Sequence, residues 1–415
     1  MPMTVDLVVP VRRISPAGEH CFFGYYDVPA ATSVGRHLGH RVGFRDRFPT
    51  PADRATLGWT DVSNEGSPES QPVPFQAFAQ TRAWNFQQGA MLQWLSSPPD
   101  TCIYNVFEAG RFGSCVHNVR TGEQRRLPMP VASVARDCRS ALCINMARVY
   151  DFRPGYGYEE VPDPFAGRAA PEEDGVFLMD VSTGDNRLIL SLAQAVDFLE
   201  HAGEKVGGRK VVVNHITWNP GATRFMFLLR TFPAPGEHWR TFLLTVSRNG
   251  DDIRNHPVWD YASHYHWRDD ENLLAYLRSA PAGRGELTLL NIADGSRALV
   301  DPDYFRADGH CSYSPDKRWI LYDSYPDTST ADCLRSLQVY SLDRRKGYML
   351  GRFRSERDSD ATLDLRCDLH PRWMPDGLSI SIDSIHEGFR AMYWVDLREF
   401  MGREQTISPG PPSKG

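Results

Sequence analysis

One strand pattern occurs seven times along this chain of 415 residues. Each copy is an apolar run that ends in a polar residue, and the copies cover residues 57–61, 115–118, 176–180, 242–245, 287–291, 337–341 and 392–396. Their spacing of about 45–65 residues is the length of a four-stranded propeller blade with variable loops. Glycine-containing hairpin turns follow several copies, at Gly122, Gly184 and Gly295. The repeat predicts an all-β fold, a seven-bladed β-propeller.

A second pattern, an aromatic residue followed two positions later by proline, precedes several copies. It occurs at Trp218 with Pro220, Tyr313 with Pro315, and Trp373 with Pro375. We interpret it as the end of the innermost strand of a blade and its turn into the second strand. A pair of β-sandwiches or a stack of sheets is the alternative, but seven copies of one unit favour the propeller.

The last repeat lacks a good fourth strand, and the N-terminal run at residues 7–11 can supply one. Closure by this strand would hide the edges of an open sheet. We therefore predict a single domain over residues 1–405, closed by the N-terminal strand, and a disordered tail over residues 406–415. Helical patterns are scarce, and residues 190–201 are the best candidate for a short helix.

Composition restricts the class of protein. Net charge is -6 with both signs interspersed, which argues against nucleic acid or an anionic membrane as partner. The N-terminus lacks the apolar core of a signal peptide, and no window approaches the roughly 18 apolar residues of a membrane span. We therefore expect a cytoplasmic protein. The eight cysteines have no framework spacing and are expected to be reduced thiols.

Four histidines occupy the same position in four successive repeats, three residues before the aromatic residue of the inner strand. They are His215, His264, His310 and His370. Equivalent inner-strand positions of a propeller lie on one circle around the channel, so these side chains are predicted to converge at one mouth. The alternative is that the four histidines are independent and that each is bonded within its own blade. Their shared position in the repeat disfavours this alternative.

A metal site is one consequence of such a cluster. Cys367 lies three residues before His370. Imidazoles with one thiolate suit zinc, with manganese or iron also possible. We predict a divalent metal, zinc or manganese, held by His264, His310, Cys367 and His370.

The same face should carry the ends of the second strands and the longest loops, at residues 152–174 and 232–239. Arginines and aromatic residues are frequent there, which indicates an anionic substrate, since guanidinium matches carboxylate and aromatic rings can stack on a sugar. An interblade salt bridge or a core tyrosine is the alternative for each residue. The candidates for substrate contact on this face are Gln88, Asn105, Arg148, Tyr150, Arg153, Arg230, His238 and Arg278.

Other catalytic motifs are absent from the sequence. There is no phosphate-binding loop, dinucleotide fingerprint, nucleophile elbow, zinc-protease helix motif or EF-hand loop.

At these residues the chain resembles the β-propeller polysaccharide lyases, which include the oligogalacturonate lyases and the ulvan and rhamnosyl-glucuronate lyase groups. The resemblance lies in the segments around His310 and around His370, and it is specific only over the second half of the chain. Oligogalacturonate lyases hold a metal through histidine and glutamine side chains at the channel mouth. His310, Cys367 and His370 stand at the matching positions, with cysteine in place of glutamine and Arg372 where a further histidine is expected. The paired histidines that ulvan-type enzymes use in early blades correspond here to Gln88 and Asn105.

This resemblance implies β-elimination on a uronic-acid oligosaccharide. Arg230 and Arg148 would then recognise the carboxylate, and Tyr150 or His215 would act as base and acid, with His264 in support. The implied partner is an acidic oligosaccharide, with the protein as a monomer or small homo-oligomer. Two rivals are a non-catalytic propeller that serves as a binding or scaffold protein, and a metal-dependent sugar hydrolase on the same scaffold.

Overall fold

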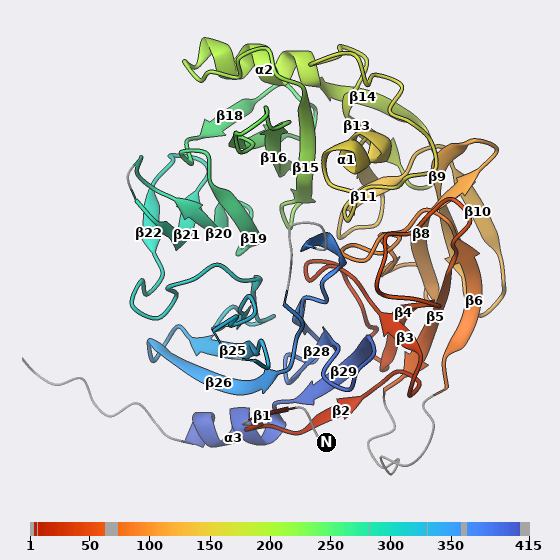
Figure 1. The fold of residues 1–415 in the computed structure, drawn as a ribbon, viewed down its shortest axis with the longest axis vertical. Coiled ribbons are helices and arrows are strands. Elements are labelled where there is room, and N and C mark those ends of the chain that lie inside the picture. Colours follow the sequence, from red (N-terminus) through yellow and green to blue (C-terminus); the bar gives the residue numbers. More distant parts are fainter. Residues whose placement is uncertain are drawn as a thin grey trace, which may run out of the picture.

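The structure, a computed structural model, describes residues 4–5, 7–62, 74–281, 283–329, 331–357 and 363–406. Seven antiparallel sheets follow one another around a central axis, so the predicted seven-bladed β-propeller is confirmed (Figure 1). Apolar side chains fill the spaces within and between the sheets in large buried clusters. Each sheet lies with its first strand nearest the axis.

The first four sheets contain four strands each, in chain order from the axis outward. The first holds β3 (His20–Phe22), β4 (Arg36–Val42), β5 (Ala55–Asp61) and β6 (Gln76–Thr81). The second holds β7 (Gln93–Trp94), β8 (Thr101–Glu108), β9 (Arg111–Asn118) and β10 (Gln124–Leu127). The third holds β11 (Val131–Val134), β12 (Ser140–Cys143), β13 (Gly175–Asp180) and β14 (Asn186–Ser191). The fourth holds β15 (Val211–Trp218), β16 (Arg224–Thr231), β17 (Thr241–Ser247) and β18 (Ile253–His256).

The last three sheets complete the ring. The fifth holds β19 (Ala262–Trp267), β20 (Asn272–Arg278), β21 (Gly285–Asn291) and β22 (Arg297–Leu299). The sixth holds β23 (Cys311–Tyr313), β24 (Trp319–Asp323), β25 (Arg335–Ser341), β26 (Lys346–Phe353) and the N-terminal β1 (Thr4–Val5). The seventh holds β27 (Arg372–Trp373), β28 (Ser379–Ser384), β29 (Ala391–Asp396) and β2 (Val11–Arg13).

The sevenfold sequence repeat corresponds to the third strand of each sheet. Its copies fall on β5, β9, β13, β17, β21, β25 and β29. Third strands pair on both sides, so their apolar runs are buried, as in β17, where six of seven residues are buried. The aromatic-x-proline pattern ends the inner strands β15, β23 and β27, as predicted.

The N-terminal segment closes the ring. β2 pairs antiparallel with β29, which places Val11 opposite Val395 and makes β2 the outer strand of the last sheet (Figure 1). The strand starts later than the predicted run at residues 7–11, of which only Val11 belongs to it. The preceding residues lie along the sixth sheet, where the Val8 N–H donates to the Leu350 carbonyl at 3.0 Å.

Three helices lie outside the sheets. α2 (Leu192–His201) agrees with the predicted helix, and its Ser191 side chain caps the first turn. α1 (Met146–Phe152) and α3 (Arg398–Thr406) were not expected. None of the helices in the described ranges combines the length and apolar character that a membrane-spanning helix needs.

α1 corrects the predicted position of two residues. Arg148 and Tyr150 were expected at the end of a second strand, but β12 ends at Cys143 and both residues lie on α1. The Asn145 side chain accepts a hydrogen bond from the Arg148 N–H and caps the helix, which ends the strand early.

Candidate functional site

The four in-register histidines gather at one end of the channel, which we call the histidine end. The His310 ring lies 4.0 Å from His264 and 4.4 Å from His370, between ring centroids. His215 stands on the other side of Tyr25, with its Nδ1 atom 3.1 Å from the Tyr25 hydroxyl. His310 thus contacts two other imidazoles, and the fourth is linked to the cluster through Tyr25.

Irregular backbone geometry determines the direction of the histidine side chains. His215 and His370 have positive φ angles of 53° and 42°, which are uncommon for residues other than glycine. β15 carries a register shift between Asn214 and Ile216, and β19 carries one just before Tyr265. A bulge of this kind turns one side chain out of the regular alternation. The cluster therefore depends on a local strain that regular strands would not produce.

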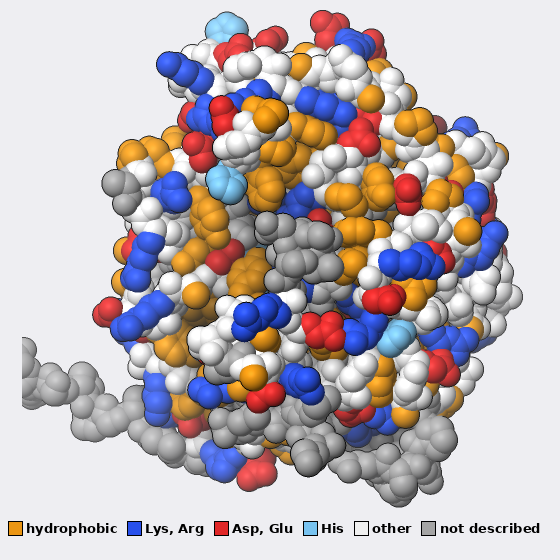
Figure 2. Space-filling model, viewed as in Figure 1, with side chains coloured by type: hydrophobic (Ala, Val, Ile, Leu, Met, Phe, Trp, Pro, Cys, Tyr) orange, Lys and Arg blue, Asp and Glu red, His pale blue; other side chains and the backbone are white. Residues whose placement is uncertain are grey.

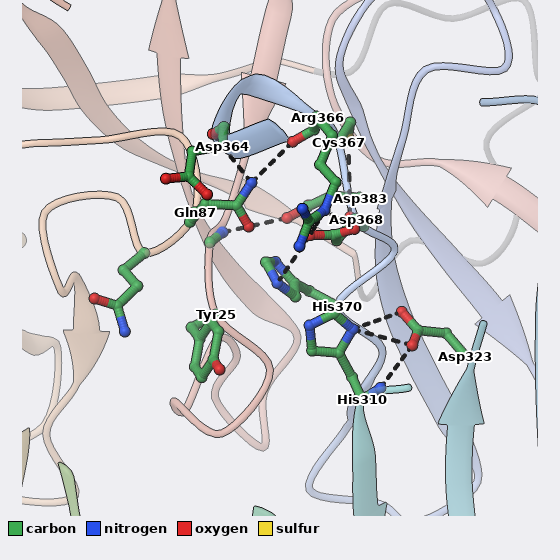
Figure 3. Close-up of polar contacts among 12 residues, drawn as sticks. Tyr25, Gln87, His310, Asp323, Asp364, Arg366, Cys367, Asp368, His370 and Asp383 are labelled. Atoms are coloured by element: carbon green, nitrogen blue, oxygen red, sulfur yellow. Dashed lines mark hydrogen bonds and ion pairs between the residues drawn. The ribbon is translucent and has the colours of Figure 1, made fainter. Parts of the chain in front are cut away.

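The loop after β3 supplies the centre of the cluster. The Tyr25 ring lies 5.1 Å from His370 and 6.1 Å from His310, between ring centroids. Figure 3 shows these three side chains near one another. The Asp383 carboxylate holds this loop by accepting hydrogen bonds from the Phe23 and Gly24 N–H groups. Gly24 has a φ of 124°, and a Cβ there would approach the Gln88 backbone to 3.0 Å. The aromatic run from Phe22 to Tyr26 was the sequence signal for this loop, and sequence reasoning missed it.

Two carboxylates orient two of the imidazoles. Asp323 lies 2.9 Å from Nδ1 of His310 and also accepts its backbone N–H at 2.7 Å. Asp308 lies 2.9 Å from Nδ1 of His264. A carboxylate on Nδ1 fixes the tautomer and directs Nε2 outward, as it does for many metal-bound histidines. Gly309 is needed for this approach, because a Cβ there would collide with the Asp323 carbonyl oxygen.

A group of three side chains fits a metal ion. One ligand atom from each of His310, Asp368 and His370 lies within 4.8 Å of the other two. The Nε2 atoms of both histidines are buried and have no hydrogen-bond partner in the described part of the chain. Two imidazole nitrogens and a carboxylate oxygen suit zinc or manganese.

This group corrects the predicted ligand set. Asp368 takes the place of Cys367, because neighbouring residues of an extended segment point to opposite sides. The Cys367 side chain instead lines a separate cavity of about 540 Å³ with Arg45 and Arg357, and burial raises its pKa to about 11, which disfavours the thiolate. His264 also lies outside the group, although its ring contacts that of His310.

Burial favours the neutral form of three of these imidazoles. It lowers the pKa of His310, and it lowers the pKa of His215 and His370 well below the ordinary value. The Arg230 guanidinium lowers the pKa of His215 further. The neutral form is the one that binds a metal or accepts a proton.

Asp368 itself is held by two arginines. Arg335 lies 2.7 Å and Arg366 2.8 Å from its carboxylate oxygens, and all three side chains are buried. The segment that carries Asp368 crosses the histidine end and is tied down by Gln87, whose side-chain amide donates to the Asp364 and Arg366 carbonyl oxygens (Figure 3).

The predicted arginines differ in their surroundings. Arg230 is buried beside His215, yet it pairs with no carboxylate in the described ranges: it donates to the Asn214 side chain and to the Ala262 carbonyl, and its Nε has no partner there. Burial and the nearby Arg153 lower its pKa to about 10. Arg153 pairs with Asp364 and lies 4.3 Å from the centroid of the Tyr156 ring.

Arg148 has a structural environment. Its guanidinium pairs with Asp163 at 2.9 Å and donates to four backbone carbonyls, among them those of Val211 and Ala169. A buried guanidinium so fully bonded fixes the loop at residues 152–174 and leaves no donor for a substrate.

The remaining predicted contacts do not join the histidines. Asn105 is buried and bonds the Val131 backbone in both directions, which links two sheets. Partial burial and the Glu159 carboxylate raise the pKa of Tyr150 to about 12. His238 is exposed, and Arg278 donates to the Trp259 carbonyl. Gln88 lines a large cavity toward the opposite end of the channel.

The outer surface has no single-sign charge field on the face shown. Basic and acidic side chains are interspersed there (Figure 2). The concentration of arginine around the histidines is therefore a property of the channel and not of the whole face.

Two solved structures share this fold over almost their whole length. One is an oligogalacturonate lyase in complex with manganese, 16% identical over 96% of this chain and 96% of that chain, with a TM-score of 0.65. The other is an oligogalacturonate lyase from Vibrio parahaemolyticus, 13% identical over 95% of this chain and 96% of that chain, with a TM-score of 0.61. No family model matches the chain, and no curated protein matches it in sequence. The resemblance to oligogalacturonate lyases in the sequence motifs therefore extends to the complete seven-bladed fold.

Proposed function

We propose that this protein is a lyase that cleaves uronic-acid-containing oligosaccharides by β-elimination at the histidine end of the channel. The observation that carries the proposal is Arg230, a buried guanidinium beside His215 that pairs with no carboxylate of the described chain. Burying a charge without a counter-charge is costly, and a substrate carboxylate would offset that cost. The two lyases of the same fold support the same class of substrate.

Elimination needs a base on one side of the sugar and an acid at the leaving oxygen. We assign His264 as the base, since Asp308 orients its ring and leaves Nε2 to accept the proton from C5. The electron pair of that C–H bond forms the C4–C5 double bond as the C4–O4 bond breaks. The Tyr25 hydroxyl, whose pKa burial raises well above its ordinary value, then protonates O4. His215, bonded to that hydroxyl, positions it. Tyr25 here replaces the predicted Tyr150.

The proposed metal site belongs to the same end. A divalent cation held by His310, Asp368 and His370 would supply Lewis-acid stabilisation of the negative charge that develops on the substrate carboxylate. Arg230, with Arg153 nearby, would bind and orient that carboxylate.

The test is turnover of digalacturonate and trigalacturonate, followed by the ultraviolet absorbance of the unsaturated product. Arg230→Gln should lower kcat/KM by about 100-fold or more, the usual loss when a charge-stabilising donor is removed. Arg254→Gln is the matched control, because Arg254 lies in the same sheet on the outer strand β18 and pairs with Asp252. It should leave turnover unchanged. Equal activity of both variants would overturn the assignment of Arg230, and absence of an unsaturated product from any uronide would overturn the function.

A further inference from the structure

A second cavity occupies the other end of the channel, where the inner strands turn into the second strands. Its volume is about 840 Å³, within the range of small-molecule binding sites. Exposed residues of its lining, among them Val34, Pro315 and Pro375, open it to solvent. Tyr25, Tyr26 and His215 line its inner end, and the two tyrosine rings also contact the rings of His370 and His310. The cavity therefore reaches the side of the histidine cluster that carries His215, while the other three channel histidines are not part of its lining.

Aromatic side chains form the wall of this cavity in register with the repeat. The aromatic residue three positions after each channel histidine contributes, and Trp94 of β7 adds a fifth ring. These residues are Trp94, Trp218, Trp267, Tyr313 and Trp373. Because they come from five different sheets, they surround the cavity, which we call the aromatic cavity. Trp373 is the most exposed of them, being only half-buried.

The polar groups in the aromatic cavity are mixed donors and acceptors. Asp27 lines it, is half-buried, forms a hydrogen bond with the Tyr265 side chain, and makes no ion pair with a cation within the described ranges. His266 is neutral, since burial lowers its pKa to about 3, and its Nδ1 accepts the Tyr313 N–H, which leaves hydrogen on Nε2. Gln88 and Thr217 add an amide and a hydroxyl that are also half-buried.

Two arginines also line the cavity without changing this mixture of donors and acceptors. The Arg372 guanidinium is committed to Asp383 and to the Gly24 carbonyl oxygen. Arg136 is exposed to solvent. Asp100, which also lines the cavity, pairs with Arg36 and Arg120. The carboxyl group without a cationic partner in the described ranges is therefore that of Asp27, and the other polar groups are neutral.

We propose that the aromatic cavity binds a neutral saccharide. Aromatic rings cover the C–H faces of a sugar, and hydroxyls that both donate and accept match a set composed of carboxyl, imidazole, amide and hydroxyl groups. In its ionised form the Asp27 carboxyl repels an acidic sugar. An organic cation would use the carboxyl and the ring faces, but it would leave the imidazole N–H, the amide N–H and the threonine hydroxyl without acceptors. This binding goes beyond the proposed elimination and does not depend on it.

Isothermal titration calorimetry on the full-length protein tests the proposal, with cellobiose, lactose and maltose as neutral probes, digalacturonate as the acidic probe and choline as the cationic probe. At least one neutral disaccharide should bind with a dissociation constant in the millimolar range or tighter. The Arg230→Gln variant should bind it unchanged, and that variant should not bind digalacturonate.

Variants locate the binding in the cavity. Trp373→Ala should weaken binding of the neutral disaccharide about tenfold or more, since it removes one ring of the wall. Trp259→Ala is the matched control, because Trp259 is exposed and lies outside the cavity. Thr217→Val keeps the shape of the side chain and removes only its hydroxyl. It should also weaken binding of the neutral disaccharide, so it tests the proposal even if Trp373→Ala does not fold.

Three results would overturn the proposal. They are no binding of any neutral disaccharide at millimolar concentration, binding that both Trp373→Ala and Thr217→Val leave unchanged, and choline binding without saccharide binding. In the last case the Asp27→Asn variant would lose choline, which would identify a cation site instead.

Discussion

The two ends of the channel are built from the same inner strands, yet they differ in chemistry. At the histidine end, strained backbone positions bring imidazoles together with carboxylates and arginines, as around His310. At the aromatic end, three residues further along each strand, tryptophan and tyrosine rings surround a wide cavity. A single strand repeat can therefore form two rings of different side chains. We propose an acidic substrate for the first ring and a neutral ligand for the second.

The largest expected effect is on the stability of the histidine end. Asp368→Asn would leave Arg335 and Arg366 buried without this carboxylate, which should lower the free energy of unfolding by about 3–5 kcal/mol. Urea denaturation measures it. Asp252→Asn is the control, because Asp252 pairs with Arg224 and Arg254 while half-exposed, and its loss should cost about 1 kcal/mol or less. Equal losses in the two variants would show that Asp368 is not a buried anchor.

The second largest effect is expected on metal binding. His310→Ala removes one of the three proposed ligands, so the purified variant should hold far less zinc or manganese, and uronide turnover should fall by about 100-fold or more. Elemental analysis and the absorbance assay measure both. His256→Ala, at a buried outer-strand histidine, should keep the wild-type metal content. Metal content that is the same in wild type and His310→Ala would contradict the ligand set.

Tyr25→Phe separates acid assistance from the shape of the site. The ring stays between the histidines while the hydroxyl that bonds His215 is lost, so kcat should fall by about 100-fold with little change in KM. Saccharide binding at the aromatic end should persist, because the Tyr25 ring, which lines the inner end of the aromatic cavity, remains. A variant with normal kcat would remove Tyr25 from the proposed mechanism.

The smallest effect is a pH dependence at the aromatic end. Burial raises the pKa of Asp27 from 3.8 to about 7. Between pH 4 and pH 7 the folded protein therefore keeps a proton that the unfolded chain has released, so the stability contributed by Asp27 falls as the pH rises through this range. The free energy of unfolding of Asp27→Asn, relative to that of wild type, should therefore be about 1 kcal/mol higher at pH 8 than at pH 5. This value allows for solvent in the cavity. Urea midpoints at both pH values measure it, and a pH-independent difference would contradict the raised pKa.

Most of the fold could be predicted from the sequence. Each sheet repeats one buried third strand, such as residues 337–341, and the apolar pattern of that strand is visible in its own short segment of sequence. The register of the four histidines likewise predicted their approach to one another. Location in the cell and oligomeric state stay predictions.

What the sequence could not supply was the direction of individual side chains. Cys367 and Asp368 are neighbours, and only the path of the extended segment decides that the carboxylate and not the thiol joins His310. Arg148 looked like a substrate ligand until the cap at Asn145 placed it on a helix against Asp163. Tyr25 belongs to the site because of a loop whose position depends on Asp383, a residue near the opposite end of the chain.

The masses of the products formed from trigalacturonate test the central claim most directly. If the histidine end performs elimination, the masses of the two products will sum to the mass of the substrate, and one product will carry the new double bond. Products whose masses sum to the substrate plus one water would show hydrolysis, and they would contradict the assignment of His264 and Tyr25 to proton transfer in an elimination.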